Sequence, residues 1–129
     1  MNEDERRAGL AETASYRYAD VVDNQLFVAG QVPHDAEGNI VGEGDPARQA
    51  VQCLENLATV LTVNGFEVGE VRHLTVYVVG PHQNLLDGWT AVAQWFDQTV
   101  PPATLLGVNL LGYRDQLIEV DATVVRQTN

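Results

Sequence analysis

The sequence predicts an α+β fold in which one mixed β-sheet has two helices packed on one of its faces. The chain has 129 residues, which is enough for one domain with a substantial core. Its apolar patterns follow the order hairpin, helix, strand, helix, hairpin, and a single sheet covered by two helices is the economical packing for that order. The other face of the sheet carries apolar residues, including Val22, Phe27 and Val108. We therefore expect other copies of the chain to cover that face.

The N-terminal half begins with a charged segment and continues as a β-hairpin. Residues 1–12 are rich in both acidic and basic side chains and are expected to form a flexible tail, which leaves residues 13–129 as the single folded domain. Apolar and aromatic residues on both sides of Asp23-Asn24 predict two strands joined by a turn. Gly30 ends the second strand, at a point where the backbone can approach a ligand or another chain closely.

Two helices and a strand form the middle of the chain. Asp45 and Pro46 are a strong helix start, and the first helix is expected to end at Asn64-Gly65. Residues 73–79 alternate as a strand that places Leu74, Val76 and Val78 on one face. Residues 85–98 have the apolar spacing of a second helix.

The C-terminal segment, residues 101–125, contains one unusually placed charge. It predicts two apolar strands that turn at Tyr113-Arg114-Asp115, with Glu119 between Ile118 and Val120. Such a carboxylate either faces solvent or is placed for chemistry. In a cleft lined by leucines its pKa would rise, and it would suit acid/base work near neutral pH.

Composition excludes several classes of function. The net charge of −11 disfavours binding to nucleic acid or to an anionic membrane surface, since both require basic clusters. All seven basic residues are arginines, so Schiff-base chemistry on lysine is excluded. A single cysteine, Cys53, cannot form an intrachain disulfide and fits a reducing compartment. The N-terminus lacks the apolar core of a signal peptide and no run reaches the length of a membrane span, so a cytoplasmic location is expected.

Metal and nucleophile signals are weak. His34, His73 and His82 share no metal-ligand spacing, so no metal site is expected. Cys53 lies beside the apolar stripe of the first predicted helix, where packing is the simpler role. The only serine, Ser15, is a weak candidate for a Ser-His-Asp hydrolase.

Several segments together are similar to a known family. The run LFVAGQVPHDAEGNIVGEGDPARQAVQCLENLATVL, followed by TVYVV, PPAT and LIEVDATVV, resembles the RidA/YjgF family from about Tyr16 to Val125. The resemblance implies a chorismate-mutase-like fold and a homotrimer with clefts between subunits. It also implies hydrolysis of reactive imines and enamines without a cofactor, with a glutamate that positions water and an arginine that binds the substrate carboxylate.

Residue by residue, the resemblance implies a modified site. The glutamate is present as Glu119 and a cleft tyrosine as Tyr16, but Thr104 stands in place of the arginine. Leu106 replaces a cysteine, Ala29 a serine and Trp89 an asparagine. Main-chain groups near Gly30 and Leu105 are expected to supply polar contacts. The implied site therefore has Glu119 as its catalytic residue, with ligand contacts from Tyr16, Ala29, Gly30, Trp89, Thr104, Leu105 and Leu106.

Loss of the arginine changes the expected substrate. We expect an enzyme that acts on a neutral or atypical imine or enamine with Glu119, rather than a typical 2-imino-acid deaminase. If Arg17 or Arg114 reached the cleft, the carboxylate clamp would return. The alternative is a non-catalytic binding or regulatory module that uses the same cleft. Ribonuclease activity, known for some relatives, fits the acidic charge least well.

Overall fold

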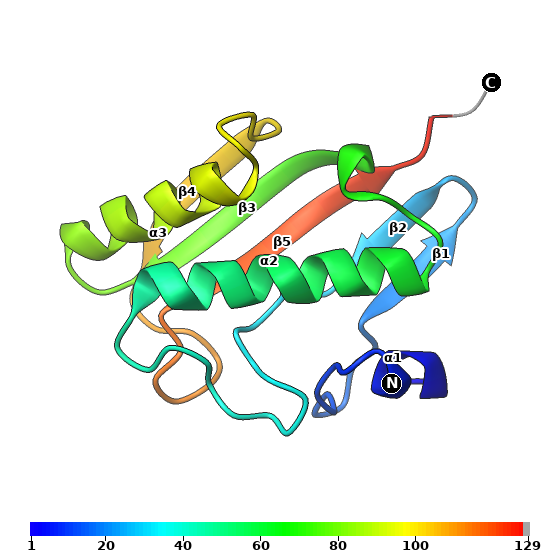
Figure 1. Cartoon of the computed structure of the whole chain (residues 1–129), viewed down its shortest axis with the longest axis horizontal. Helices are drawn as coiled ribbons and strands as arrows, with labels where there is room; N and C mark the ends of the chain where they lie inside the picture. Colours follow the sequence, from blue (N-terminus) through cyan, green and yellow to red (C-terminus); the bar gives the residue numbers. More distant parts are fainter. Residues whose placement is uncertain (128–129) are drawn as a thin grey trace.

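The computed structural model describes residues 1–127 and contains one five-stranded mixed sheet, with two long helices on one face (Figure 1). The strand order is β1-β2-β5-β3-β4, and every neighbouring pair is antiparallel except β3 and β4. This confirms the predicted α+β class. The elements are α1 (Glu3–Arg7), β1 (Ala19–Val22), β2 (Gln25–Val28), α2 (Pro46–Val63), the 3₁₀ turn η1 (Val68–Glu70), β3 (Val71–Val79), α3 (His82–Trp95), β4 (Ala103–Val108) and β5 (Ile118–Val125).

The N-terminal segment differs from the expected flexible tail. Residues 3–7 form helix α1, in which Asn2 and Glu5 make a reciprocal capping box. Leu10 is buried with Tyr18 and Val60, so the segment that follows α1 packs against helix α2. The charged composition of this segment does not indicate a folded structure. The capping box and the burial of Leu10 are nevertheless enough to order a short helix and attach it to the domain.

Helix α2 begins and ends as its sequence signals predicted. The Asp45 side chain accepts a hydrogen bond from the backbone N–H of Arg48 at 3.0 Å, and Pro46 occupies the first helical position. Gly65 follows the C-cap residue Asn64 with a left-handed φ of 78°. The apolar side of α2 is buried against the sheet.

Strand β3 and helix α3 complete the core. Leu74, Val76 and Val78 of β3 are buried on the helix side, which confirms the predicted alternation. Helix α3 begins at His82, one turn earlier than expected, directly after Pro81. It also ends earlier, because Asp97 and Gln98 adopt left-handed φ values of 54° and 64° that a helix cannot continue through.

The C-terminal strands do not form the expected hairpin. Strand β4 pairs in parallel with β3 at the edge of the sheet, whereas β5 lies between β2 and β3 (Figure 1). The turn at residues 113–115 is present, but it belongs to a longer connection that passes the end of β3. Burial decides the pairing, because Ile118, Val120 and Val124 of β5 are buried in the core and a central position covers them.

The sheet face away from α2 and α3 is open in the single chain. Phe27 on β2 is 57% exposed and Leu106 on β4 is 43% exposed. Thr75 and Tyr77 of β3 lie between them on the same face, in register with Asp121 and Glu119 of β5. Within residues 1–127, none of the helices is both long and apolar enough to cross a membrane.

Candidate functional site

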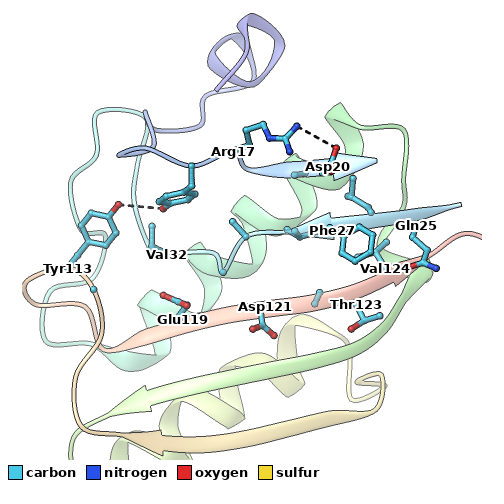
Figure 2. A pocket seen from close by; sticks show the side chains of 18 residues that line it. Arg17, Asp20, Gln25, Phe27, Val32, Tyr113, Glu119, Asp121, Thr123 and Val124 are labelled. Atoms are coloured by element: carbon cyan, nitrogen blue, oxygen red, sulfur yellow. Dashed lines mark hydrogen bonds and ion pairs between the residues drawn. The ribbon is translucent and has the colours of Figure 1, made fainter. Parts of the chain in front are cut away.

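A groove with a volume of about 780 Å³ lies over β1, β2 and β5 on the open face of the sheet (Figure 2). The hairpin forms one wall and the loop before β5 closes one end. Four of the residues expected at the site line it, namely Tyr16, Ala29, Gly30 and Glu119. Further side chains that face it are Arg17, Asp20, Phe27, Tyr113, Asp121 and Thr123.

Glu119 is the central acidic group of the groove. Strand alternation directs it to the open face, opposite Tyr77 on β3, while its neighbours Ile118 and Val120 enter the core. Its Oε1 accepts a hydrogen bond from Gln116 Nε2 at 3.2 Å. Burial raises the pKa of Glu119 above its ordinary value; the Gln116 hydrogen bond opposes this rise and the charge of Asp121 adds to it. At a given pH near its pKa, a larger fraction of this carboxyl group is therefore protonated than of an exposed glutamate.

The backbone at Gly30 passes directly beside this carboxylate. Gln31 forms two backbone hydrogen bonds with Val120, which fixes the segment after β2 against β5. The Gln31 side chain donates to the carbonyl of Ala29 at 2.8 Å and holds the same segment from within. A Cβ atom on residue 30 would lie 2.8 Å from Cδ of Glu119, so a glycine is needed for this approach.

Two tyrosines meet across the end of the groove. The hydroxyl groups of Tyr16 and Tyr113 are 3.5 Å apart (Figure 2). The Tyr113 ring packs edge-on against His34, with ring centroids 4.6 Å apart. Burial, followed by the hydrogen bond to Tyr113, raises the pKa of Tyr16. The Tyr16 hydroxyl therefore stays protonated at neutral pH and can donate to a ligand.

The groove is acidic. Asp20, Glu119 and Asp121 line it, and Tyr77 donates a hydrogen bond to Asp121 at 2.9 Å. Arg17 also lines it, but its guanidinium forms an ion pair with Asp20, with 3.5 Å between Nη1 and Oδ1 (Figure 2). The Arg17 side chain is 75% exposed and points away from Glu119.

Arg114 lies outside the groove. It lines an adjoining hollow formed by Val79 and residues 110–117, and it is not among the residues that line the groove. In the single chain, neither Arg17 nor Arg114 therefore reaches Glu119 in the way that a carboxylate clamp requires.

The other expected ligand contacts do not meet Glu119 within one chain. Thr104, Leu105 and Leu106 lie on edge strand β4, and β3 separates them from β5. Thr104 is opposite Thr75 and its hydroxyl is 3.3 Å from His73 Nε2, whereas Leu106 is opposite Tyr77. Two strand spacings of about 4.8 Å place β4 about 10 Å from β5.

Trp89 lies in the helical layer. It is partly buried and packs against the core from α3, on the other side of the sheet from the groove in this chain. The anchor role between helix and sheet is the one that this arrangement supports.

Two residues of the site were not anticipated from the sequence. Tyr113 had been assigned only to a turn, and Gln116 carried no prediction. The role of Tyr113 depends on its contact with Tyr16, which is distant in the sequence. The role of Gln116 depends on the path of a loop that brings its side chain to the Glu119 carboxylate. The spacing of Gln116 and Glu119, three residues apart at the start of a strand, was the only available signal.

The described residues include no group of three or more His, Cys, Asp or Glu side chains arranged to hold a metal ion. Cys53 is buried and its Sγ faces the carbonyl of Ile118 at 3.7 Å. Burial raises its pKa well above the ordinary value, and the charge of Glu119 adds to this rise. Among the described side chains, Glu119 is therefore the strongest candidate for proton transfer.

The fold and the groove define a small α+β protein with an acidic groove on the open face of its sheet. A family model described as Endoribonuclease L-PSP matches residues 7–126, and the chain belongs to this family, also called RidA/YjgF. A RutC family protein of Pyrococcus horikoshii is 30% identical over 112 residues, which cover 87% of each chain. The 2-iminobutanoate/2-iminopropanoate deaminase of Salmonella typhimurium is 30% identical over 110 residues, 81% of each chain.

A solved structure shows the same fold. A putative endoribonuclease of Thermotoga maritima superposes with a TM-score of 0.83 at 27% identity, covering 98% of this chain and 96% of that one. This confirms the fold and the family that the resemblance implied.

Proposed function

We propose that the protein catalyses cofactor-free hydrolysis of a small neutral imine or enamine, with Glu119 as the general acid and base. The observation that carries this proposal is the half-buried Glu119 carboxyl group, which has a raised pKa and faces the groove. A carboxyl group of this kind exchanges protons efficiently closer to neutral pH than an exposed one.

The reaction needs only water and proton transfers. Water oxygen bonds to the imine carbon while Glu119 takes one water proton and passes it to the nitrogen, which gives the carbinolamine. Glu119 then takes the hydroxyl proton and delivers it to the nitrogen, the C–N bond breaks, and the carbonyl product and the neutral amine leave. For an enamine, protonated Glu119 first donates a proton to the β-carbon, which converts the enamine into the iminium ion that water attacks. The Tyr16 and Tyr113 hydroxyls, 3.5 Å apart, are suited to donate hydrogen bonds to the substrate's polar group.

The charges of the groove favour a substrate without a carboxylate. The Salmonella relative is named for two 2-imino acids, which supports imine chemistry at this site. In this chain, however, Asp20, Glu119 and Asp121 would repel such an anion, and Arg17 is paired with Asp20. Loss of a buried partner for a charged group costs about 2–5 kcal/mol, or roughly 30-fold to several-thousand-fold in affinity. Thr104 donates one neutral hydrogen bond at most.

The complete cleft is proposed to lie between copies in a homotrimer. The open face exposes Phe27 and Leu106. The five residues of β4 from Ala103 to Gly107 are all exposed, and Val108 is half-buried. Covering these groups with a neighbouring copy would remove apolar surface from water. It would also allow Thr104 and Leu106 of one copy to approach the groove of another, as the family resemblance implies.

Substitution of the carboxyl group tests the proposed chemistry. Purified wild-type protein and Glu119→Gln are assayed for carbonyl and amine release on a panel of neutral acyclic imines, cyclic imines, enamines and 2-imino acids. We expect a 10²–10⁴-fold loss of rate in Glu119→Gln, the usual contribution of a general acid or base. Glu55→Gln, which changes an exposed carboxylate on α2, is the matched control and should retain full rate. Equal rates in wild type and Glu119→Gln, with unchanged oligomeric state, would refute the proposed role.

A non-catalytic binding module is the second candidate. It is favoured by Thr104 and Ala29, which stand where the family resemblance implies an arginine and a serine. Both positions lack the polar groups that the family resemblance implies for substrate handling. In that case the same panel would raise the melting temperature without turnover, since a ligand that binds only the native state stabilises it. Measured turnover that depends on Glu119 would exclude this candidate.

A further inference from the structure

We propose that Gln116 is the positioning residue of the site, which holds Glu119 Oε1 and leaves Oε2 as the oxygen available to a ligand. Gln116 is located in the loop before β5 and is only 3% exposed. Glu119 follows it by three residues, on the strand that forms the floor of the groove (Figure 2). The two side chains meet because the chain enters β5 immediately after the loop.

The orientation of the Gln116 amide is fixed by its partners at both ends. Its Oε1 accepts a hydrogen bond from the backbone N–H of Tyr113 at 3.2 Å. Its Nε2 donates to the carbonyl of Ile118 at 3.0 Å and to Glu119 Oε1 at 3.2 Å. The amide therefore uses both hydrogens, and a flip would place its oxygen against two acceptors. One carboxylate oxygen of Glu119 is thus assigned to the protein.

The second oxygen, Oε2, lies on the Gly30 side of the carboxylate, where the glycine leaves room for it. Among the described residues no hydrogen-bond donor to Oε2 is found. A carboxylate with one oxygen held and the other free presents a single, directed acceptor, which is the arrangement that proton transfer to a bound molecule requires.

The same hydrogen bond stabilises the charged form of Glu119. Burial raises the pKa of this carboxyl group and the donation from Gln116 lowers it. The other titratable groups around Glu119 are Asp121 on the same strand, Tyr77 on β3, Cys53 on α2, and Tyr16 near Tyr113 at the groove end. Gln116 is the neutral hydrogen-bond donor to this carboxylate. Its removal is therefore expected to raise the pKa of Glu119 and to favour the protonated acid.

Gln49 provides an internal comparison. It is also buried. Its Oε1 accepts a hydrogen bond from the backbone N–H of Leu117 at 2.7 Å, and its Nε2 donates one to the carbonyl of Asp115 at 3.1 Å. Both glutamines therefore bind the backbone of the segment that leads into β5, but only the Gln116 amide also donates a hydrogen bond to the Glu119 carboxylate. A purely structural role would make the two substitutions equivalent at Glu119.

The test measures the titration of Glu119 by ¹³C NMR of protein labelled at the glutamate carboxyl carbon. Glu119→Gln assigns the signal by its disappearance. We expect Gln116→Met to raise the titration midpoint of Glu119, whereas Gln49→Met lowers the melting temperature without moving that midpoint. An unchanged midpoint in folded Gln116→Met would overturn the proposal, as would an equal shift in both variants.

A second variant protects the test against misfolding. Gln116→Glu keeps the side-chain shape and places a second carboxyl group at the position of the amide, 3.2 Å from Glu119 Oε1. The two groups should then release their protons in two separate macroscopic steps. Two independent titrations with the wild-type Glu119 midpoint would show that the contact does not form in solution.

The functional meaning of this contact rests on the proposed role of Glu119, but the titration does not. Absence of turnover on every substrate would remove the proposed hydrolysis and leave the shifted midpoint intact. Where turnover is found, the acidic limb of the pH–rate profile should move upward in Gln116→Met and stay in place in Gln49→Met. A profile that moves equally in both would show a general loss of structure instead.

Discussion

The carboxylate of Glu119 occupies the space that a side chain on Gly30 would fill. A Cβ atom at that position would lie 2.8 Å from Cδ and 3.2 Å from Cγ of Glu119, both inside normal van der Waals contact. The backbone φ of Gly30 lies outside the left-handed region, so conformational freedom does not explain the glycine. The glycine is explained instead by the close approach of its backbone to Glu119, which brings the segment after β2 against this carboxylate of β5.

Gly30→Ala should therefore displace the Glu119 side chain. The overlapping atoms belong to the end of a flexible side chain, so the fold should survive with an overpacking cost of about 1–3 kcal/mol. Ligand binding or turnover should fall by a larger factor, because a misplacement of about 1 Å at a catalytic group costs about 10²-fold. Denaturant unfolding and the imine assay measure the two effects.

Gly69→Ala is the matched control for this substitution. Gly69 also lies outside the left-handed region, and a Cβ there would meet nothing within 4 Å. The free energy of unfolding of Gly69→Ala should stay equal or rise by about 0.4–1 kcal/mol, because alanine lowers the conformational entropy of the unfolded chain. Equal effects of the two alanine substitutions on activity would contradict the close contact between Gly30 and Glu119.

The titration of Glu119 predicts a specific pH dependence of stability. Its pKa in the folded chain is raised above the ordinary value of 4.5, so the native state binds more protons than the unfolded state between those two values. The stability contribution of this group is therefore fully present below pH 4.5 and is lost as pH rises through the folded pKa. Glu119→Gln should be more stable than wild type at neutral pH, and this advantage should vanish at pH 4 and below. Thermal melts across the pH range measure the difference, and a constant advantage would refute the raised pKa.

Thr104→Arg should restore the binding of anionic substrates. Thr104 is exposed on edge strand β4, where its hydroxyl contacts His73, so the substitution should change stability by no more than about 0.5 kcal/mol. An arginine completing the proposed inter-subunit cleft should improve affinity for 2-imino acids by ~30-fold or more. Thr104→Gln, which is long but neutral, should not. Equal affinities for the two variants would place position 104 outside the cleft.

Leu106→Asp should break the proposed trimer. Leu106 is 43% exposed on the open face, and a charge in a buried interface is strongly disfavoured. Light scattering should give three copies for wild type and a smaller species for the variant. Leu86→Asp is the control, because Leu86 is 50% exposed on α3, on the opposite side of the sheet. A monomeric wild type, or a trimer in both variants, would contradict the proposed interface.

Cys53 should not react with thiol reagents in the native protein. Its side chain is fully buried in the core and burial raises its thiol pKa, so both access and thiolate are lacking. Labelling with a chromogenic disulfide should proceed only at the rate of unfolding and should accelerate with denaturant. Fast labelling under native conditions would show that α2 opens locally.

Local signals predicted most of the elements correctly. Helix α2 begins at Pro46 and is followed by Gly65 because the N-cap aspartate, the proline and the glycine act within one turn of the backbone. The alternation of β3 identified its buried face for the same reason, since the side-chain period of a strand is local. The structure of residues 1–12 was harder to predict, because their charged composition suggests a flexible tail. A capping box and the buried Leu10 order this segment instead.

The pairing of the C-terminal strands could not be predicted in this way. A turn between two apolar segments suggests a hairpin, but β5 pairs with β2 and β3 instead. The choice depends on which strand buries more apolar surface at the centre of the sheet, and that is a property of the whole core. The site followed the same rule, since the meeting of Tyr16 with Tyr113 joins segments 97 residues apart.

The sequence by itself determined the α+β class, the family, the limits of α2 and the identity of Glu119 as the acid/base candidate. The α+β class and the limits of α2 follow from backbone propensity and side-chain periodicity, whereas the family and the choice of Glu119 rest on motifs that resemble those of the RidA/YjgF family. Only the tertiary structure decided the central position of β5, the Gln116 contact to Glu119, the pairing of Arg17 with Asp20 and the separation of Thr104 from the groove. These depend on distances between segments, which are set by close packing of the core and by strand register.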